Sequence, residues 1–190
     1  MDFTGISDGN ILCLHSPSVR TLTISRRILA EAAILIALSG TLHLIRPFQL
    51  PFGGSITLGS MVPILLFSLR RGTLPGIFAG TLFGFIVLIQ EPFIFHPFQV
   101  FLDYPLAFGV LGLAGLFKKN PIFGVGVGIA GRFVAHFLSG IIFFAEFAPE
   151  GMNPYLYSAL YNGSYLTAEF AIGVILIYAL FRRGILEWNL

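Results

Sequence analysis

Apolar runs of membrane-spanning length dominate this sequence and limit what it can fold into. Hydrophobic residues make up 56% of the 190 residues and charged residues only 11%. A bilayer core about 30 Å thick needs roughly 20 apolar residues for each spanning helix. With a mean hydropathy of +0.88, the chain does not fit a soluble globular domain. We therefore predict an all-α integral membrane protein.

Charged residues, prolines and glycines divide the apolar sequence into six candidate spans. They cover about 28–46, 58–70, 73–91, 98–117, 121–146 and 154–182. The N-terminal stretch carries aspartates and no continuous apolar run, so we expect 1–24 to be a cytoplasmic tail rather than a cleavable signal peptide. Its cysteine, Cys13, is the only one in the chain, which excludes an intrachain disulfide. Residues 25–190 are then a single six-helix transmembrane domain.

Basic residues predict the orientation of these spans. All lysines and arginines except Arg46 and Arg132 fall on one side of the six-span arrangement. The loops on the other side carry Glu91, Glu146 and Glu150. Because basic loops remain in the cytoplasm, we predict that both termini are cytoplasmic.

Glycine strings in the spans are interpreted as packing surfaces. GVGIAG at 126–131 has the spacing of a dinucleotide-binding loop, but that loop requires a preceding strand and a βαβ unit. GIFAGTLFG at 76–84 places glycines four residues apart, a spacing that lets helices approach closely in lipid. The sequence has no Walker-type phosphate loop. We expect no cofactor, metal or nucleic-acid partner.

Several ionisable residues fall inside the predicted spans, where charge is costly and marks function or pairing. They are Glu31, Asp103, Arg132, His136 and Glu169. A helical rise of about 1.5 Å per residue places Asp103 and His136 at the same depth, roughly 22 Å above the cytoplasmic boundary. Tyr157 and Asn162, early in the last span, fall in the same outer half. We predict a polar pocket built from these four residues, with 144–153 as its rim.

A purely structural interpretation of the same residues stays open, in which a hydrogen-bond network ties the helices together. Glu31 is expected to pair with Arg27 one helical turn away, and Glu169 with Arg132 across two spans. His43 lies near the outer end of the first span, where we expect it to reach toward the interface.

Two other function classes also stay open. An intramembrane hydrolase would need a nucleophile beside a base, and Ser139 or Ser158 near His136 is the available pair. Neither serine lies in a recognisable nucleophile motif. A gradient-driven carrier could use Asp103 and His136 as a proton relay, although the chain shows no internal repeat.

Three stretches carry a resemblance to a known family. They are GRFVAHFLSGIIFFAEFAPEGMNPYLYSALYNGSYL at 131–166, LPFGGSITLGSMVPILLFSLRRGTLPG at 50–76 and FQVFLDYPLAFGVLGLAGLF at 98–117. From about Arg26 onward the chain resembles the thiamine-specific substrate-binding (S) component of energy-coupling factor (ECF) transporters. The resemblance implies a vitamin-capturing bundle in a prokaryotic cell membrane. It also implies docking on a transmembrane coupling subunit that carries two cytoplasmic ATPases.

The resemblance further implies which residues bind the ligand and which meet the coupling subunit. The implied ligand-binding positions are Asp103, Tyr104, His136, Phe144, Tyr157 and Asn162. Thiamine joins a permanent thiazolium cation to an aminopyrimidine, which suits a buried carboxylate, aromatic faces and polar side chains. The family has glutamate at Asp103 and tryptophan at Phe144, so a component for another vitamin or for hydroxymethylpyrimidine stays open. The small-residue strip of Ala33 and Ala37 is implied to meet the coupling subunit.

Overall fold

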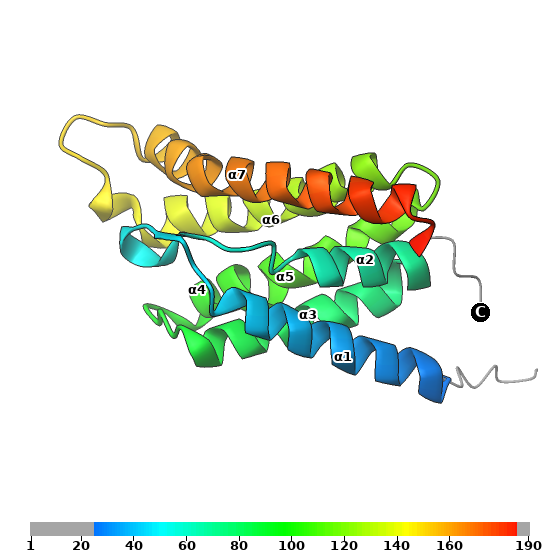
Figure 1. The fold of residues 1–190 in the computed structure, drawn as a ribbon. Coiled ribbons are helices and arrows are strands. Elements are labelled where there is room, and N and C mark those ends of the chain that lie inside the picture. The colour runs from blue at the N-terminus through cyan, green and yellow to red at the C-terminus, as the bar shows by residue number, and fades with distance from the viewer. Residues whose placement is uncertain (1–24, 186–190) are drawn as a thin grey trace, which may run out of the picture.

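The structure is a computed structural model that describes residues 25–185. Long helices run beside one another in a bundle, and the start of α1 and the end of α7 lie at the same end of it (Figure 1). The loops that join the helices at the opposite end form a cap there (Figure 1). The predicted tail, 1–24, lies outside the described residues.

The helices follow the predicted spans to within a few residues at most ends. They are α1 (Arg26–His43), α2 (Val62–Arg71), α3 (Thr73–Gln90), α6 (Pro121–Phe143) and α7 (Pro154–Arg182). Between α3 and α6 one helical segment runs from Pro97 to Phe117. It consists of α4 (Pro97–Phe101), the π-helical turn η2 (Leu102–Leu106), α5 (Ala107–Gly109) and the 3-10 segment η3 (Val110–Phe117). The loop cap contains the antiparallel strands β1 (Phe48–Gln49) and β2 (Ser55–Ile56), with the 3-10 turns η1 (Pro51–Gly53) and η4 (Ala145–Phe147).

Four helical segments within 25–185 are long and apolar enough to cross a membrane. They are Thr73–Gln90, Pro97–Phe117, Pro121–Phe143 and Pro154–Arg182. The predicted class, a helical multi-pass membrane protein, agrees with this finding. The helix α2, with 10 residues, is too short to cross a membrane by itself. The helix α1 is longer, but three charged residues near its start, Arg26, Arg27 and Glu31, make it less apolar than the other four segments. The count of six spans therefore stays a prediction.

The helix α2 begins later than predicted because the chain before it enters the bundle in a non-helical form. Thr57 and Ser60 are buried there. The backbone N–H and the hydroxyl of Thr57 both donate to Oε1 of Glu169, the hydroxyl at 2.7 Å. The prediction that Glu169 pairs with Arg132 is wrong, because its carboxylate accepts hydrogen bonds from Thr57 in this buried loop instead.

Glu31 pairs with the end of α2 rather than with Arg27. Its Oε1 lies 2.7 Å from Arg70 Nη1, and its Oε2 accepts a 2.7 Å hydrogen bond from Arg71 Nε. Arg27 is exposed, whereas Glu31 is turned toward the bundle. The predicted pair is therefore wrong, and the ion cluster instead ties the start of α1 to the turn between α2 and α3.

Glycines of α3 allow its backbone to touch that of the next helical segment. A Cβ atom at Gly80 would lie 2.2 Å from the carbonyl oxygen of Phe108, and one at Gly84 would lie 2.5 Å from that of Tyr104. The packing interpretation of 76–84 is confirmed. The string at 126–131 lies inside α6, so it has no strand-to-helix context for a dinucleotide.

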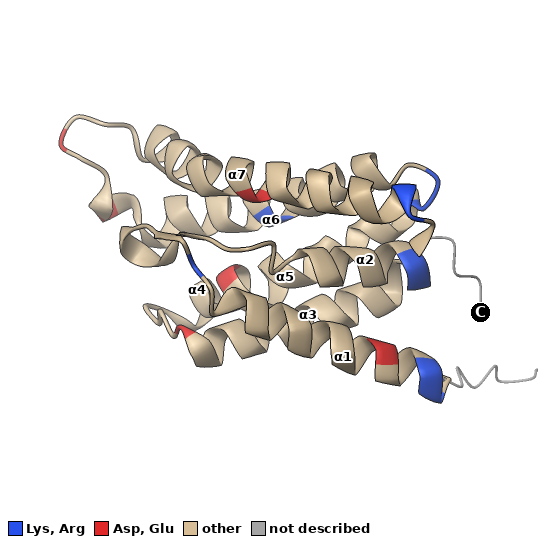
Figure 2. Cartoon of the chain, in the orientation of Figure 1, with Lys and Arg blue, Asp and Glu red and all other residues tan. Residues whose placement is uncertain are grey.

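Charged residues divide between the two ends of the bundle. Lysines and arginines lie mostly at the end where α1 begins and α7 ends (Figure 2). Glu146 and Glu150 belong to the loop between α6 and α7, at the other end. This division is the pattern expected of a bundle whose basic end faces the cytoplasm.

Candidate functional site

A cavity near the loop cap brings together the residues that the sequence singled out. Its walls come from α6, α7 and the Pro97–Phe117 segment, and the loops around η1 and η4 also contribute. The residues implied by the family resemblance all line it: Asp103, Tyr104, His136, Phe144, Tyr157 and Asn162. The structure thus brings these side chains to one place, and their role in binding stays a prediction.

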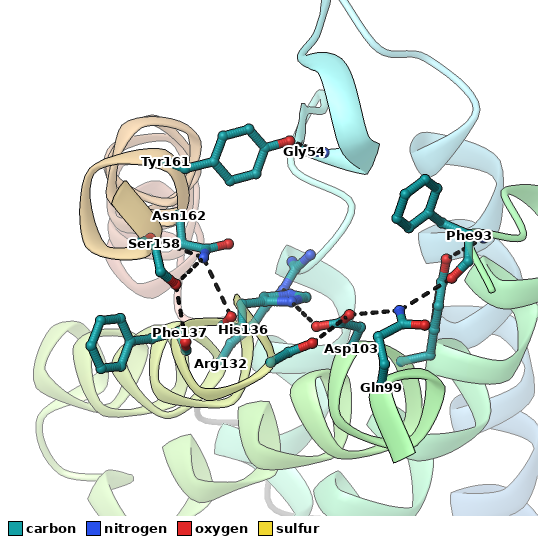
Figure 3. Close-up of polar contacts among 12 residues, drawn as sticks. Gly54, Phe93, Gln99, Asp103, Arg132, His136, Phe137, Ser158, Tyr161 and Asn162 are labelled. Carbon is teal, nitrogen blue, oxygen red and sulfur yellow. Dashed lines mark hydrogen bonds and ion pairs between the residues drawn. The ribbon is translucent and has the colours of Figure 1, made fainter. Parts of the chain in front are cut away.

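Asp103 is the centre of the polar network in this cavity (Figure 3). Its Oδ1 lies 3.0 Å from His136 Nδ1, as the common depth of the two residues predicted. Its Oδ2 accepts hydrogen bonds from Ser139 Oγ at 2.8 Å and from Gln99 Nε2 at 2.7 Å. Asp103 belongs to the π-helical turn η2, which contains Pro105; such turns are frequent at functional sites. Both carboxylate oxygens are therefore held in place.

The hydrogen bonds of His136 define its tautomer. Arg132 Nε lies 3.2 Å from His136 Nε2, and arginine can only donate. Nε2 must therefore accept, which leaves the ring proton on Nδ1 to be donated to Asp103. The guanidinium of Arg132 also lies 4.1 Å from the ring centroid of Phe108, in a cation–π contact. The imidazole thus separates the carboxylate of Asp103 from the guanidinium of Arg132.

Gln99 links Asp103 to the loop between α3 and α4, and the sequence analysis missed it. Its side chain is almost fully buried, with 1% exposed. Besides donating to Asp103, Nε2 donates to the carbonyl oxygen of Phe93 at 3.1 Å, and Oε1 accepts from the N–H of Phe95 at 3.0 Å. An uncharged amide within an apolar run gives no signal comparable to that of an ionisable residue. Gln99 positions the carboxylate relative to this loop.

The amide of Asn162 joins α7 to α6. Its Nδ2 donates to the carbonyl oxygen of His136 at 3.3 Å and to that of Ser158 at 3.0 Å. Its Oδ1 accepts from the hydroxyl of Tyr165 at 3.0 Å. Ser158, Asn162, Tyr165 and Glu169 are all buried, which confirms that they share one inward-facing stripe of α7.

Aromatic rings surround the outer part of the cavity. Phe144 lies with its ring centroid 5.7 Å from that of Phe93 and 5.9 Å from that of Phe147. Phe147 in turn lies 4.7 Å from Phe52 in η1. The predicted rim, 144–153, contributes Phe144 and Phe147 to the cavity, and Phe52 from the loop around η1 lines it as well. Tyr155, just after the predicted rim, is 61% exposed and does not line the cavity.

Tyr161 holds this loop over the cavity. Its hydroxyl accepts a hydrogen bond from the N–H of Gly54 at 3.0 Å and donates to the carbonyl oxygen of Pro51. Its ring centroid lies 6.0 Å from that of Tyr157. Tyr161 was not among the predicted site residues, because its partners are backbone groups of a loop whose path the sequence does not specify.

The serines do not form a nucleophile and base pair with His136. Ser139 Oγ donates to Asp103 Oδ2, and Ser158 Oγ donates to the carbonyl oxygen of Phe137 at 3.0 Å. Both ring nitrogens of His136 are already engaged by Asp103 and Arg132. The geometry therefore gives no support to a hydrolase.

The charged side chains that line the cavity are Asp103, Glu91 and Arg132. The imidazole of His136 lies between the carboxylate of Asp103 and the guanidinium of Arg132, so these two groups do not form a direct ion pair. Glu91, which also lines the cavity, lies 2.5 Å from Arg46 Nη1. The carboxylate of Asp103 is bonded by an amide, a hydroxyl and an imidazole, and a carboxylate without an arginine or lysine partner within 25–185 favours a cationic ligand.

Comparison with known proteins assigns the chain to a family. The family model described as thiamine transporter protein (Thia_YuaJ) matches residues 29–185. The chain belongs to the thiamine transporter family. The thiamine transporter ThiT of Bacillus subtilis (strain 168) is 33% identical over 172 residues, which cover 80% of this chain and 89% of that protein. ThiT of Lacticaseibacillus paracasei is 30% identical over 144 residues, covering 63% of this chain and 72% of that protein.

A solved structure supports the same assignment. The structure of ThiT from Listeria monocytogenes matches this thiamine transporter family member with a TM-score of 0.75 at 26% identity. The match covers 83% of this chain and 94% of that chain. The relatives are named transporters, so the polar cavity belongs to a transport protein rather than to an enzyme.

Proposed function

We propose that the chain captures thiamine in the cavity around Asp103 and serves as the S component of an ECF transporter. The observation that carries this proposal is the carboxylate of Asp103, held by three donors in an aromatic-rimmed cavity. Thiamine carries a permanent cation and two aromatic rings, which suit such a cavity.

The proposal gives each of the predicted binding residues a role. Asp103 faces the thiazolium, and Phe144 or Tyr104 stacks on a ring. Because both nitrogens of His136 are engaged, its ring face is the part that contacts the ligand. Tyr157 and Asn162 hydrogen-bond the rings or the hydroxyethyl group.

The proposal includes six spans, with both termini in the cytoplasm of a prokaryotic cell. Two features support it: α1 and α2 run along the other helices, and the basic end of the bundle gathers most lysines and arginines (Figures 1 and 2). Loops of this composition remain in the cytoplasm. The cavity then opens to the outside, where the vitamin is captured.

We propose that α1 docks on a transmembrane coupling subunit, which two cytoplasmic ATPases drive. Ala33 and Ala37 are both exposed on α1, next to the exposed side chains of Ile34 and Leu38. Small residues at this spacing let helices approach closely in lipid.

Ala37→Trp is expected to abolish copurification with the coupling subunit, because the indole ring would keep the two helices apart. Thiamine binding should stay unchanged, since Ala37 does not line the cavity.

Thermal unfolding of the purified chain in detergent tests the ligand. A ligand that binds only the folded state stabilises it by about 2.7 kcal/mol at a hundredfold excess over Kd. We expect thiamine to raise the unfolding temperature and riboflavin to leave it unchanged. A rise with hydroxymethylpyrimidine and none with thiamine would assign the precursor instead.

Gln99→Met is expected to raise the Kd for thiamine roughly tenfold or more. Methionine matches glutamine in size, but it cannot donate to Oδ2 of Asp103 or to the carbonyl oxygen of Phe93. A hydrogen bond to a charged group contributes about 1.5–3 kcal/mol, and its loss leaves the carboxylate less firmly placed for the ligand. Gln90→Met is the matched control, since Gln90 Nε2 bonds to the carbonyl oxygen of Gly40 at 3.1 Å and does not line the cavity. Calorimetric titration should show an unchanged Kd for the control. Equal losses in both variants would contradict a positioning role for Gln99.

A further inference from the structure

The Pro97–Phe117 segment has two faces, and the cavity around Asp103 uses one of them. Tyr104 and Phe108 line this cavity together with Asp103. On the same face the ring of Phe108 packs edge-on against that of His43, with centroids 6.5 Å apart. The expectation that His43 reaches toward the interface is wrong, because it is 4% exposed and lies inside the bundle. This face of the segment is therefore directed inward.

A groove lies on the other face, between the segment and α3. Pro105 and Gly109 line its floor and are buried, whereas Phe101 at its edge is 55% exposed. A side chain at position 109 would narrow the groove, since a Cβ atom there would lie 2.7 Å from Thr81 Oγ1. Among the described residues that line the groove, Thr81 alone has a polar side chain, and none is charged. The groove is thus almost entirely apolar.

The length and volume of the groove suit one hydrocarbon chain. It extends from Phe101 to Leu113; at about 1.5–2 Å per residue this distance is roughly 20 Å, within the bilayer core of about 30 Å. Its volume of about 230 Å³ exceeds that of an apolar cavity that accepts benzene, about 150 Å³, and falls below the roughly 300 Å³ of pockets that enclose whole small molecules. A helix with its side chains is about 10–12 Å across, so a single methylene chain is the better fit.

The surroundings of the groove place it in contact with lipid. Both of its walls, Thr73–Gln90 and Pro97–Phe117, are long and apolar enough to cross a membrane. Phe78 and Leu82, which neighbour the lining residues of α3, are 65% and 55% exposed. In lipid, association depends on close packing rather than on the exclusion of water, and an unfilled groove forfeits those contacts. An acyl chain is the molecule that the bilayer supplies to fill it.

We propose that the groove binds one acyl chain of a membrane phospholipid. The chain packs against Pro105 and Leu106, which belong to the same π-helical turn as Asp103. Proline has no N–H to donate to the helix, so contacts from the lipid side support a turn whose own hydrogen bonding is incomplete. The groove shares no lining residue with the cavity around Asp103, and the proposal does not depend on the proposed function.

Photo-crosslinking in phosphatidylcholine nanodiscs tests this site, with a trace of phosphatidylcholine that carries a diazirine on one acyl chain. Mass spectrometry of the digested chain then counts adducts residue by residue. Adducts at Leu106 and Val110 should exceed those at Leu160 about threefold or more, because packing in the groove holds the chain in place. Leu160 is the reference, since it is 58% exposed on α7 and does not line the groove.

Two exchanges on α3 separate the groove from general contact with lipid. Ile77→Trp fills the groove, which Ile77 lines, and should remove most adducts at Leu106 and Val110. Ile89→Trp is the matched control, because Ile89 is 80% exposed and lies outside the groove; its adducts should equal those of wild type. Thr81→Leu is a second filling variant with the same expected loss, should Ile77→Trp not fold.

Two results would overturn the acyl-chain site. One is that adducts at Leu106 and Val110 are no more frequent than at Leu160, or are unchanged by the filling variants. The other is that they are rarer than at Leu160 in wild type, which would mean that a second copy of the chain covers the groove.

Discussion

Asp103→Asn should remove most thiamine binding and raise the Kd at least about thirtyfold, as expected when one partner of a buried charge pair is neutralised. Asparagine has nearly the same size, so the cavity keeps its shape. Its amide nitrogen, however, must face one of the donors that now bond to the carboxylate, from Gln99, Ser139 or His136. Calorimetric titration of the purified variant measures the loss.

Glu150→Gln is the matched control for this variant. Glu150 is exposed in the loop between α6 and α7, at the end of the bundle where the loop cap lies (Figure 1). Its replacement removes the same charge without touching the network, and the Kd should stay within about twofold, because exposed charges interact weakly through water. Equal effects in the two variants would mean that the ligand responds to the overall field rather than to Asp103.

Gly80→Ala should destabilise the bundle by about 3 kcal/mol, near the upper end of the usual cost of overpacking. The added methyl group would lie 2.2 Å from the carbonyl oxygen of Phe108 and 3.2 Å from Cα of Gly109. These are backbone atoms, which cannot move aside as a flexible side chain can. The helix α3 must therefore shift away from the Pro97–Phe117 segment, and unfolding in detergent should occur at lower temperature.

Gly126→Ala is the control for this packing effect. The nearest atom to its added methyl group belongs to the side chain of Phe170, at 3.8 Å. Alanine also favours the helix over glycine by about 1 kcal/mol, so this variant should be as stable as wild type or more stable. If both glycines tolerate alanine equally, the close contact of α3 with the Pro97–Phe117 segment is contradicted.

The sequence predicted the helices and the contact between Asp103 and His136 in the cavity for clear physical reasons. Lipid requires long apolar helices, so span length and charge placement locate most of their ends. Helices that cross the same bilayer share one depth scale, which predicts Asp103 and His136 at the same level; the two side chains lie 3.0 Å apart in the structure. The same scale placed Asn162 within reach of α6, where it bonds the backbone of His136.

Partners from non-helical segments could not be predicted in this way. Glu169 bonds Thr57 because the chain before α2 enters the bundle without forming a helix. Tyr161 bonds the backbone at Pro51 and Gly54 in the loop cap for a similar reason. Sequence spacing indicates which groups share a helix face, but it does not specify the path of a loop.

Calorimetric titration of the purified wild-type chain with thiamine is the most direct test of the proposal that this chain captures the vitamin. Parallel titrations with hydroxymethylpyrimidine and riboflavin show whether the cavity selects the complete vitamin. We predict that thiamine binds with a Kd of about 1 μM or lower, more tightly than either of the other compounds. No binding of thiamine at micromolar concentration, together with tight binding of another compound, would contradict the proposal that the cavity around Asp103 captures thiamine.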